Sequence, residues 1–268
     1  MTLVAQISDP HICRRGELLY GIVDSATALR RAVSTVNALN PQPDLVIVSG
    51  DLANDGAAEA YDHLIEILDE LHRPWLAIPG NHDVPEVAAE VLVDHCFPQD
   101  DGGWGPCSGV VDLDGVRIIG LNSVCEGEPS GVLDPRDLEA TAVALAGRGD
   151  RIAVVVVHHP PVALGLAAMD AMRLDDASAR RLGDLVDDHA VDTVLVGHVH
   201  RASATGWRGS LLLSCPSPAF SIAMDLDPAT PLTVSDEPAA ILVHRFIDGV
   251  HTAHVHAVGE RLSIAVNY

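Results

Sequence analysis

The first two thirds of the chain alternate short apolar runs with longer segments in which apolar residues recur at helical spacing. The runs cover 3–8, 45–49, 75–78, 152–157 and 194–196, which is the length and content of buried strands. The segments between them, at 24–39, 57–71, 85–95, 135–146 and 175–189, favour helices. A strand followed by a helix, repeated along the chain, predicts a largely parallel sheet with helical crossovers.

The pattern changes after about residue 109. Apolar positions at 110–113 and 116–121 flank an Asp-Gly turn, a combination that predicts a β-hairpin. The final third, with runs at 210–214, 240–246 and 252–258, is rich in strands, so we expect it to form a second sheet packed on the first. The stretches 97–108 and 216–238 lack periodicity and are long for connections, which is typical of functional loops.

Length and hydropathy predict a single large domain. The 268 residues, of which 48% are hydrophobic, are enough for one domain over 1–268 with a well-buried core. No apolar run approaches the length that crosses a bilayer, so we expect no membrane segment. The amino terminus has no basic region before an apolar stretch, which makes a cytoplasmic location the default expectation.

Charge and residue usage exclude several classes of function. The net charge of −22, from 38 acidic against 16 basic residues, disfavours tight non-specific binding to nucleic acid or to an anionic membrane. All 16 basic residues are arginine, so Schiff-base chemistry on lysine and a P-loop lysine are excluded. The five cysteines include no C-x-x-C pair, which argues against a structural zinc knuckle.

Residue types that bind metals follow each of the five apolar runs. Because the functional crevice of an open α/β sheet lies at the carboxyl ends of its strands, we expect the fold to gather these residues in one place. Oxygen and imidazole donors without cysteine suit manganese, iron or zinc. The residues are Asp9 and His11, Asp51, Asn81 and His82, His158 and His159, and His198 and His200.

The order D-x-H, G-D, G-N-H-D, H and G-H-x-H, found between residues 9 and 200, resembles the motifs of the calcineurin-like metallophosphoesterases. The resemblance implies a two-sheet β-sandwich flanked by helices, in four layers as α/β/β/α, with a dinuclear metal centre between the ends of the sheets. It covers all five motifs, and their occurrence together in this order is highly specific. We therefore expect an enzyme that binds two divalent metal ions per chain and hydrolyses phosphoric diesters.

The resemblance also implies a role for each residue. The first metal would be held by Asp9, His11, Asp51 and His200, and the second by Asp51, Asn81, His158 and His198, with Asp51 as the bridge. His158 is preferred because the family's ligand directly follows the strand, and His159 is the alternative. His82 matches the family's catalytic histidine, which protonates the leaving oxygen or stabilises the transition state. Asp83 is expected either to support His82 or to cap the next helix.

In this family the paired metals lower the pKa of bound water, and a metal-bridging hydroxide attacks phosphorus in line. Purple acid phosphatases of the same superfamily have a metal-binding tyrosine three residues after the bridging aspartate, where this chain has Asn54. A site with ferric iron would lack that tyrosine ligand, and manganese, iron(II) and zinc remain the candidate metals.

The small size and the forms D-P-H, H-H-P-P and G-H-V-H are most similar to bacterial class III cyclic nucleotide phosphodiesterases and related glycerophosphodiesterases. The resemblance implies a small phosphodiester substrate, with 3′,5′-cyclic AMP as the leading candidate. Alternatives are a glycerophosphodiesterase, a phosphodiesterase or phosphomonoesterase of broad specificity, and a non-enzymatic scaffold that holds metal for binding. In related enzymes the segments after the G-H-x-H strand shape the substrate mouth and contacts in a homodimer. We expect the same of the strand- and loop-rich part from about residue 201.

Overall fold

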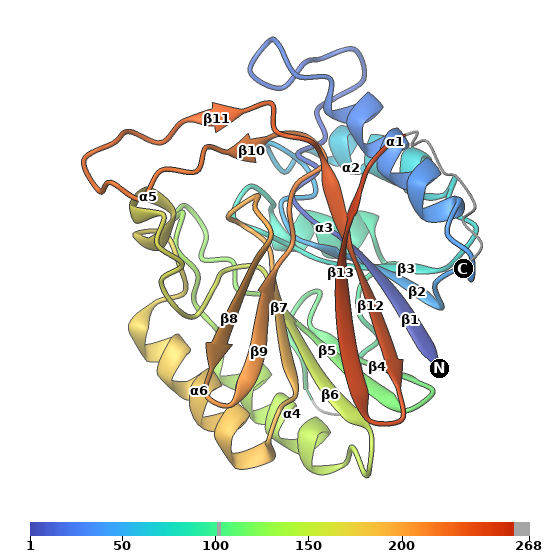
Figure 1. Cartoon of the computed structure of the whole chain (residues 1–268), viewed down its shortest axis with the longest axis vertical. Helices are drawn as coiled ribbons and strands as arrows, with labels where there is room; N and C mark the ends of the chain where they lie inside the picture. Colours follow the sequence, from blue (N-terminus) through green and yellow to red (C-terminus); the bar gives the residue numbers. More distant parts are fainter. Residues whose placement is uncertain (101–102, 260–268) are drawn as a thin grey trace, which may run out of the picture.

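Two β-sheets pack face to face in the middle of the molecule, and helices cover the outer face of each sheet (Figure 1). The computed structural model describes residues 1–100 and 103–259. The first sheet has the strand order β13-β12-β1-β2-β3, and the second has the order β4-β5-β6-β7-β9-β8. This arrangement confirms the predicted two-sheet sandwich flanked by helices.

The elements are defined by the following bounds. The first sheet contains β1 (Thr2–Ile7), β2 (Leu45–Ser49), β3 (Trp75–Ile78), β12 (Ala240–Ile247) and β13 (Val250–Ala257). The second contains β4 (Gly109–Leu113), β5 (Val116–Leu121), β6 (Ile152–Val157), β7 (Thr193–Val196), β8 (Ser203–Trp207) and β9 (Ser210–Ser214). A separate hairpin pairs β10 (Ser221–Ile222) with β11 (Val234–Ser235). The helices are α1 (Ser25–Asn37), α2 (Ala58–Leu68), α3 (Pro85–Val91), α4 (Pro135–Ala146), α5 (Ala167–Asp170) and α6 (Asp176–His189).

Three groups of buried apolar side chains separate the four layers. One group lies between the sheets and includes Ile47 of β2 and Val156 of β6, both fully buried. The other two lie under the helices, where α1, α2 and α3 cover the first sheet and α4 and α6 cover the second. Because β1, β2, β6 and β7 are covered on both faces, they read as continuous apolar runs rather than alternating ones.

The distribution of strands over the two sheets differs from the sequence-based expectation. The strands before the five motifs do not share one sheet, since β1, β2 and β3 lie in the first and β6 and β7 in the second. The final third does not form a sheet of its own either. Its β9 pairs in parallel with β7, whereas β12 pairs antiparallel with β1 and extends the first sheet. The predicted hairpin after residue 109 is confirmed as β4 and β5.

A chain of hydrogen bonds crosses the otherwise apolar layer between the sheets. Gln6 on β1 donates from Nε2 to the Oγ of Ser49 (2.8 Å) and accepts at Oε1 from the Nε2 of His244 (3.1 Å). The Nδ1 of His244 faces the Nε2 of His251 (3.1 Å), and the Nδ1 of His251 lies 2.8 Å from the hydroxyl of Thr193 on β7. Burial lowers the pKa of His244 to about 3, so this imidazole is neutral in the folded protein.

Acid should therefore weaken the fold through His244. Its imidazole takes up a proton near pH 6.5 in the unfolded chain, but in the folded protein only near pH 3. The contribution of neutral His244 to the free energy of unfolding is complete above about pH 6.5 and is lost as the pH falls toward 3. Denaturant titrations of metal-free protein should show that His244→Gln reduces the slope of unfolding free energy against pH by up to about 1.4 kcal/mol per unit between about pH 6 and 4.

The matched control is His254→Gln, because His254 is an exposed histidine of the neighbouring strand β13. That variant should keep the pH dependence of the wild type. An unchanged slope in His244→Gln would mean that other buried histidines carry the acid sensitivity.

Candidate metal centre

The strands that precede the five motifs end on one edge of the sandwich. β1, β2 and β3 run parallel in the first sheet, and β6 and β7 run parallel in the second. The two edges are joined directly, because the carboxylate of Asp9 accepts a hydrogen bond from the backbone N–H of His198 (3.0 Å). The structure thus brings the predicted ligands from both sheets to one place, while their binding of metal stays a prediction.

The backbone is strained at five of the seven predicted ligands. The φ angles are 54° at Asp9, 45° at His11, 48° at Asp51, 68° at His198 and 51° at His200. This left-handed conformation is rare outside glycine and costs on the order of 1–3 kcal/mol per residue. Strain of this kind gathers at functional sites, where the surrounding structure holds a side chain in a required position.

The first group of ligand atoms is formed by Asp9, His11, Asp51 and His200, all of which are buried. The Nε2 atoms of His11 and His200 lie 3.1 Å apart. A carboxylate oxygen flanks each of them, since Asp51 Oδ2 is 3.4 Å from His11 Nε2 and Asp9 Oδ1 is 3.4 Å from His200 Nε2. The four donors predicted for the first metal therefore converge.

The second group is formed around the side-chain oxygen of Asn81. Its Oδ1 lies 2.9 Å from the Nδ1 of His198 and 3.3 Å from the Nε2 of His158. The same His158 nitrogen is 3.4 Å from Asp51 Oδ1. The two oxygens of Asp51 therefore face different groups, which is the geometry of a bridging carboxylate.

Backbone carbonyls fix the ring of three histidines in this region. In each case Nδ1 lies at hydrogen-bond distance from a carbonyl oxygen, which requires Nδ1 to carry the proton and leaves Nε2 toward the site. The pairs are His158 with Ser49 (2.9 Å), His200 with Phe220 (3.1 Å) and His82 with Asn54 (2.9 Å). The role of the Phe220 carbonyl cannot be predicted from the sequence, because a main-chain contact has no signature in residue type.

This arrangement fits bound cations. A neutral His158 with its proton on Nδ1 would present a lone pair at Nε2 toward the oxygens of Asp51 and Asn81, which are acceptors themselves. Acceptors that converge in a buried place need a positive charge among them. Burial alone lowers the pKa of His158, but Asp51 and Asp9 outweigh it and raise that pKa to about 9. The donor set of carboxylate, amide and imidazole suits a divalent metal in that position.

His159 is close to the second group but is held by other contacts. Its ring lies within reach of His158 and His198, so the three histidines together have the spacing of a metal site. However, its Nδ1 bonds the hydroxyl of Ser123 (2.8 Å) and its Nε2 bonds the carbonyl of Pro129 (3.2 Å). Both ring nitrogens are thus occupied, which favours His158 as the ligand.

Asp83 does neither of the things expected of it from sequence. Helix α3 begins after Val84 without a side-chain cap, and the Asp83 carboxylate does not contact the His82 ring. Instead it accepts hydrogen bonds from the backbone N–H groups of Leu52 (2.9 Å) and Gly80 (2.8 Å), among others. It therefore ties the loop that carries Asp51 to the loop that carries Asn81 and His82.

His82 lies beside both groups without belonging to either. Its ring packs edge-on against the ring of His11, with 4.7 Å between the centroids. Its backbone N–H donates to Asp51 Oδ1 (2.9 Å), and the ring lines the cavity over the metal centre. The side chain is only half-buried, so it can meet a molecule that enters the cavity.

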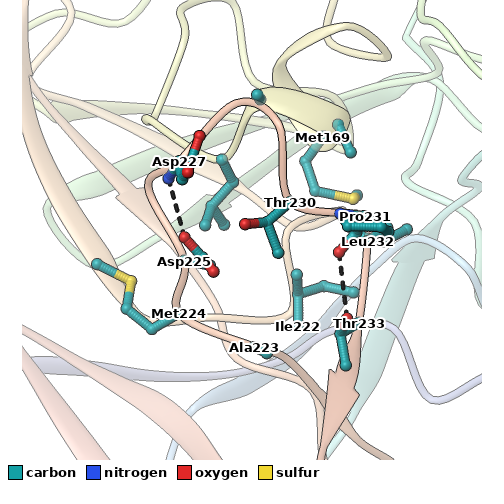
Figure 2. Close-up of a pocket in the computed structure, with 13 residues that line it drawn as sticks. Met169, Ile222, Ala223, Met224, Asp225, Asp227, Thr230, Pro231, Leu232 and Thr233 are labelled. Atoms are coloured by element: carbon teal, nitrogen blue, oxygen red, sulfur yellow. Dashed lines mark hydrogen bonds between the residues drawn. The ribbon is translucent and has the colours of Figure 1, made fainter.

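A cavity of about 250 Å³ lies next to the predicted ligands, and a second cavity of about the same volume adjoins it. The first opens onto His11, Asp51, Asn81, His198 and His200 and has apolar walls. The second lies between α5 and the β10–β11 hairpin (Figure 2). The two cavities share three apolar lining residues, Met169, Ile222 and Leu232.

The model of the calcineurin-like phosphoesterase family matches residues 2–202. A relative called probable glycerophosphodiester phosphodiesterase GpdQ, from Arcobacter nitrofigilis, is 32% identical over 94% of this chain and 93% of its own. The 3′,5′-cyclic adenosine monophosphate phosphodiesterase CpdA of Escherichia coli is 28% identical over 96% of this chain and 90% of its own. The chain therefore belongs to the calcineurin-like phosphoesterase family, as the motifs predicted.

Solved structures agree on the fold. The purple acid phosphatase PPD1 of yellow lupin superposes with a TM-score of 0.59 at 13% identity, over 91% of this chain and 49% of its own. The calcineurin-like phosphoesterase family uses a dinuclear metal centre, and the two groups of side chains described above are placed to provide one. Within residues 1–100 and 103–259, every helix is too short or too polar to cross a bilayer.

The choice between the two adjacent histidines can be tested by a matched pair of variants. His158→Leu removes a predicted ligand of the second metal, so it should lose about half of the bound metal after loading and dialysis. His159→Leu removes a side chain that bonds Ser123 and Pro129, so it should keep the full metal content despite some loss of stability. Elemental analysis of both variants decides the assignment, and the opposite pattern would make His159 the ligand.

Proposed function

We propose that this protein is a metal-dependent phosphodiester hydrolase that works with two divalent ions per chain, and that 3′,5′-cyclic AMP is its leading candidate substrate. The observation that carries the proposal is the position of Asp51, whose two oxygens face two separate groups of ligand atoms. Membership of the phosphoesterase family and relatives called phosphodiesterases support the reaction class.

Seven side chains are the proposed ligands. They are Asp9, His11, Asp51 and His200 for one ion, and Asp51, Asn81, His158 and His198 for the other. When bound, such a pair of ions supplies positive charge for a phosphate ester and lowers the pKa of water, and manganese, iron(II) or zinc suit these donors. The protein contributes a fixed orientation of several donors: carbonyl groups hold the rings of His158 and His200, and backbone N–H groups hold the carboxylates of Asp9 and Asp51.

His82 is proposed as the acid that serves the leaving oxygen. Its Nδ1 stays bonded to the carbonyl of Asn54, which fixes the ring while Nε2 gives up a proton. A metal-holding scaffold would not need a half-buried imidazole beside the ligand groups and on the cavity wall. The position of His82 therefore favours an enzyme over the scaffold alternative.

The walls of the first cavity favour a cyclic nucleotide over a glycerophosphodiester. Phe220, Met172 and Val234 offer apolar surface, which a nucleobase can cover and a glycerol group cannot. A glycerophosphodiester remains the second candidate, because relatives from Arcobacter and Enterobacter carry that name. A phosphodiesterase or phosphomonoesterase of broad specificity is the third candidate.

The part from about residue 201 is proposed to shape the mouth of the site. Its hairpin contributes Leu232 and Val234 to the cavity over the metal centre, and both are substantially exposed. Met224 and Leu226 on the same hairpin are 60% and 62% exposed. Apolar surface of this kind also suits a contact with a second copy of the chain, so a homodimer is part of the proposal.

The function is tested by assaying one metal-loaded preparation against cyclic AMP, a glycerophosphodiester and a phosphomonoester. We expect the highest kcat/KM with cyclic AMP. Asp51→Ala is the negative control, since it removes the carboxylate shared by both groups and should lose most bound metal and nearly all turnover. Normal metal content and turnover in that variant would contradict the dinuclear site. If the wild type has its highest kcat/KM with another ester, that ester replaces cyclic AMP as the proposed substrate.

His82→Ala separates acid catalysis from metal binding. The variant should keep its metal content, while kcat falls by roughly 10²–10⁴-fold, the range usual for a positioned acid. Esters whose leaving alcohol has a low pKa need less protonation and should lose less. Equal losses across a series of leaving groups would instead indicate that His82 acts in substrate binding.

A further inference from the structure

We infer that the second cavity, between α5 and the β10–β11 hairpin, is the subsite for the uncharged nucleoside part of a nucleotide diester whose phosphate lies at the metal centre. The inference rests on the proposed function and names the substrate class of the same site. Figure 2 shows the cavity, with Met169 reaching from α5 toward Leu232 of the hairpin.

The second cavity continues the first rather than standing apart from it. Met169, Ile222 and Leu232 line both, so one molecule can cover both sides of this wall. Met169 and Ile222 also pack on Val199, which lies between the predicted ligands His198 and His200. The wall is thus fixed to the metal-binding strand end, and its position relative to the metals is set by packing.

Charge decides which part of a substrate can enter the second cavity. In the described parts of the chain, the residues that line the two cavities include no arginine. The nearby Arg201 is already bonded to the carbonyl of Ile222 (2.6 Å) and to Glu237 (2.7 Å). Asp225 and Asp227 line the far side, so a second phosphate there would meet negative charge without a cation. An uncharged group is therefore favoured.

The remaining walls match a nucleoside better than a hydrocarbon chain. Met169 offers a polarizable thioether for the face of a base, and Phe220 forms an aromatic edge of the adjoining cavity. The second cavity also has the hydroxyls of Thr230 and Thr233 on its wall. The hydroxyl of Thr233 donates to the carbonyl of Pro231 (3.1 Å) and can still accept, so the N–H and hydroxyl groups of a nucleoside can bond it, which a hydrocarbon chain cannot do.

The test fills the second cavity from two opposite walls. Ala168 on α5 and Ala223 on the hairpin line this cavity but not the one over the metals, so Ala168→Trp and Ala223→Trp should block it selectively. Val143→Trp, at an exposed position of α4, is the matched control for adding an indole. Three probes separate the parts of the substrate: adenosine, inorganic phosphate and cyclic AMP.

We expect metal-free wild type to bind adenosine in calorimetry, and each cavity-filling variant to weaken that binding about 10-fold or more. In the metal-loaded protein, the KM for cyclic AMP should rise by a similar factor. Inhibition by inorganic phosphate, which needs only the metal centre, should stay within about 2-fold of wild type. Retained phosphate binding also shows that the variants are folded.

The two hypotheses fail in different ways. If wild type does not bind adenosine, or if both tryptophan variants bind it as well as Val143→Trp does, the subsite is wrong. The subsite would also be wrong if the tryptophan variants weakened the binding of adenosine and of phosphate by the same factor, because the two cavities would then not act separately. If adenosine binds and the variants weaken it while no diester is hydrolysed, the subsite stands and the proposed hydrolase does not.

Discussion

Hydrogen bonds from backbone amides to buried carboxylates hold the loops that carry the predicted metal ligands in register. Asp9 accepts from His198 (3.0 Å), Asp51 accepts from His82 (2.9 Å), and Asp83 accepts from Leu52 (2.9 Å). Each bond joins a loop to one that follows a different strand, and the first joins the two sheets. Hydrogen bonds to an ionised group are roughly twice as strong as neutral ones. They can therefore offset the left-handed backbone conformations at the ligands.

Close packing of the backbone explains the glycine at the start of two of the three motifs that begin with this residue. A Cβ on Gly50 would lie 2.1 Å from the Nδ1 of His158, and one on Gly80 would lie 2.4 Å from the backbone nitrogen of Asp51. Neither neighbour can move without displacing a predicted ligand. The glycines of G-D and G-N-H-D are therefore required by the approach of the loops to one another, and Gly50 also has a positive φ of 96°.

The sequence was enough to predict the strands and the convergence of their ends. Those inferences depend on local features, namely apolar runs followed by polar residues. The sheet that each strand joins depends instead on pairings such as β1 with β12, which bring together residues more than 200 positions apart. A run of buried residues does not reveal which other strand it will pair with. The role of Asp83 was missed for the same reason, because its partner Leu52 lies in another loop.

Electrostatics connect the acidic composition of the chain to the substrate proposed for it. The net charge of −22 repels anions at long range, but salt screens that repulsion beyond about 8–10 Å. Within the described cavity walls the only basic side chains are the predicted ligands His11, His198 and His200 and the neighbouring His82. In the proposed site, positive charge for a phosphate would come from the two metal ions, and it would be confined to one end of the pocket. A substrate with its single anionic group at one end and an uncharged body at the other satisfies both constraints. A polyanion would place charge where Asp225 and Asp227 already lie.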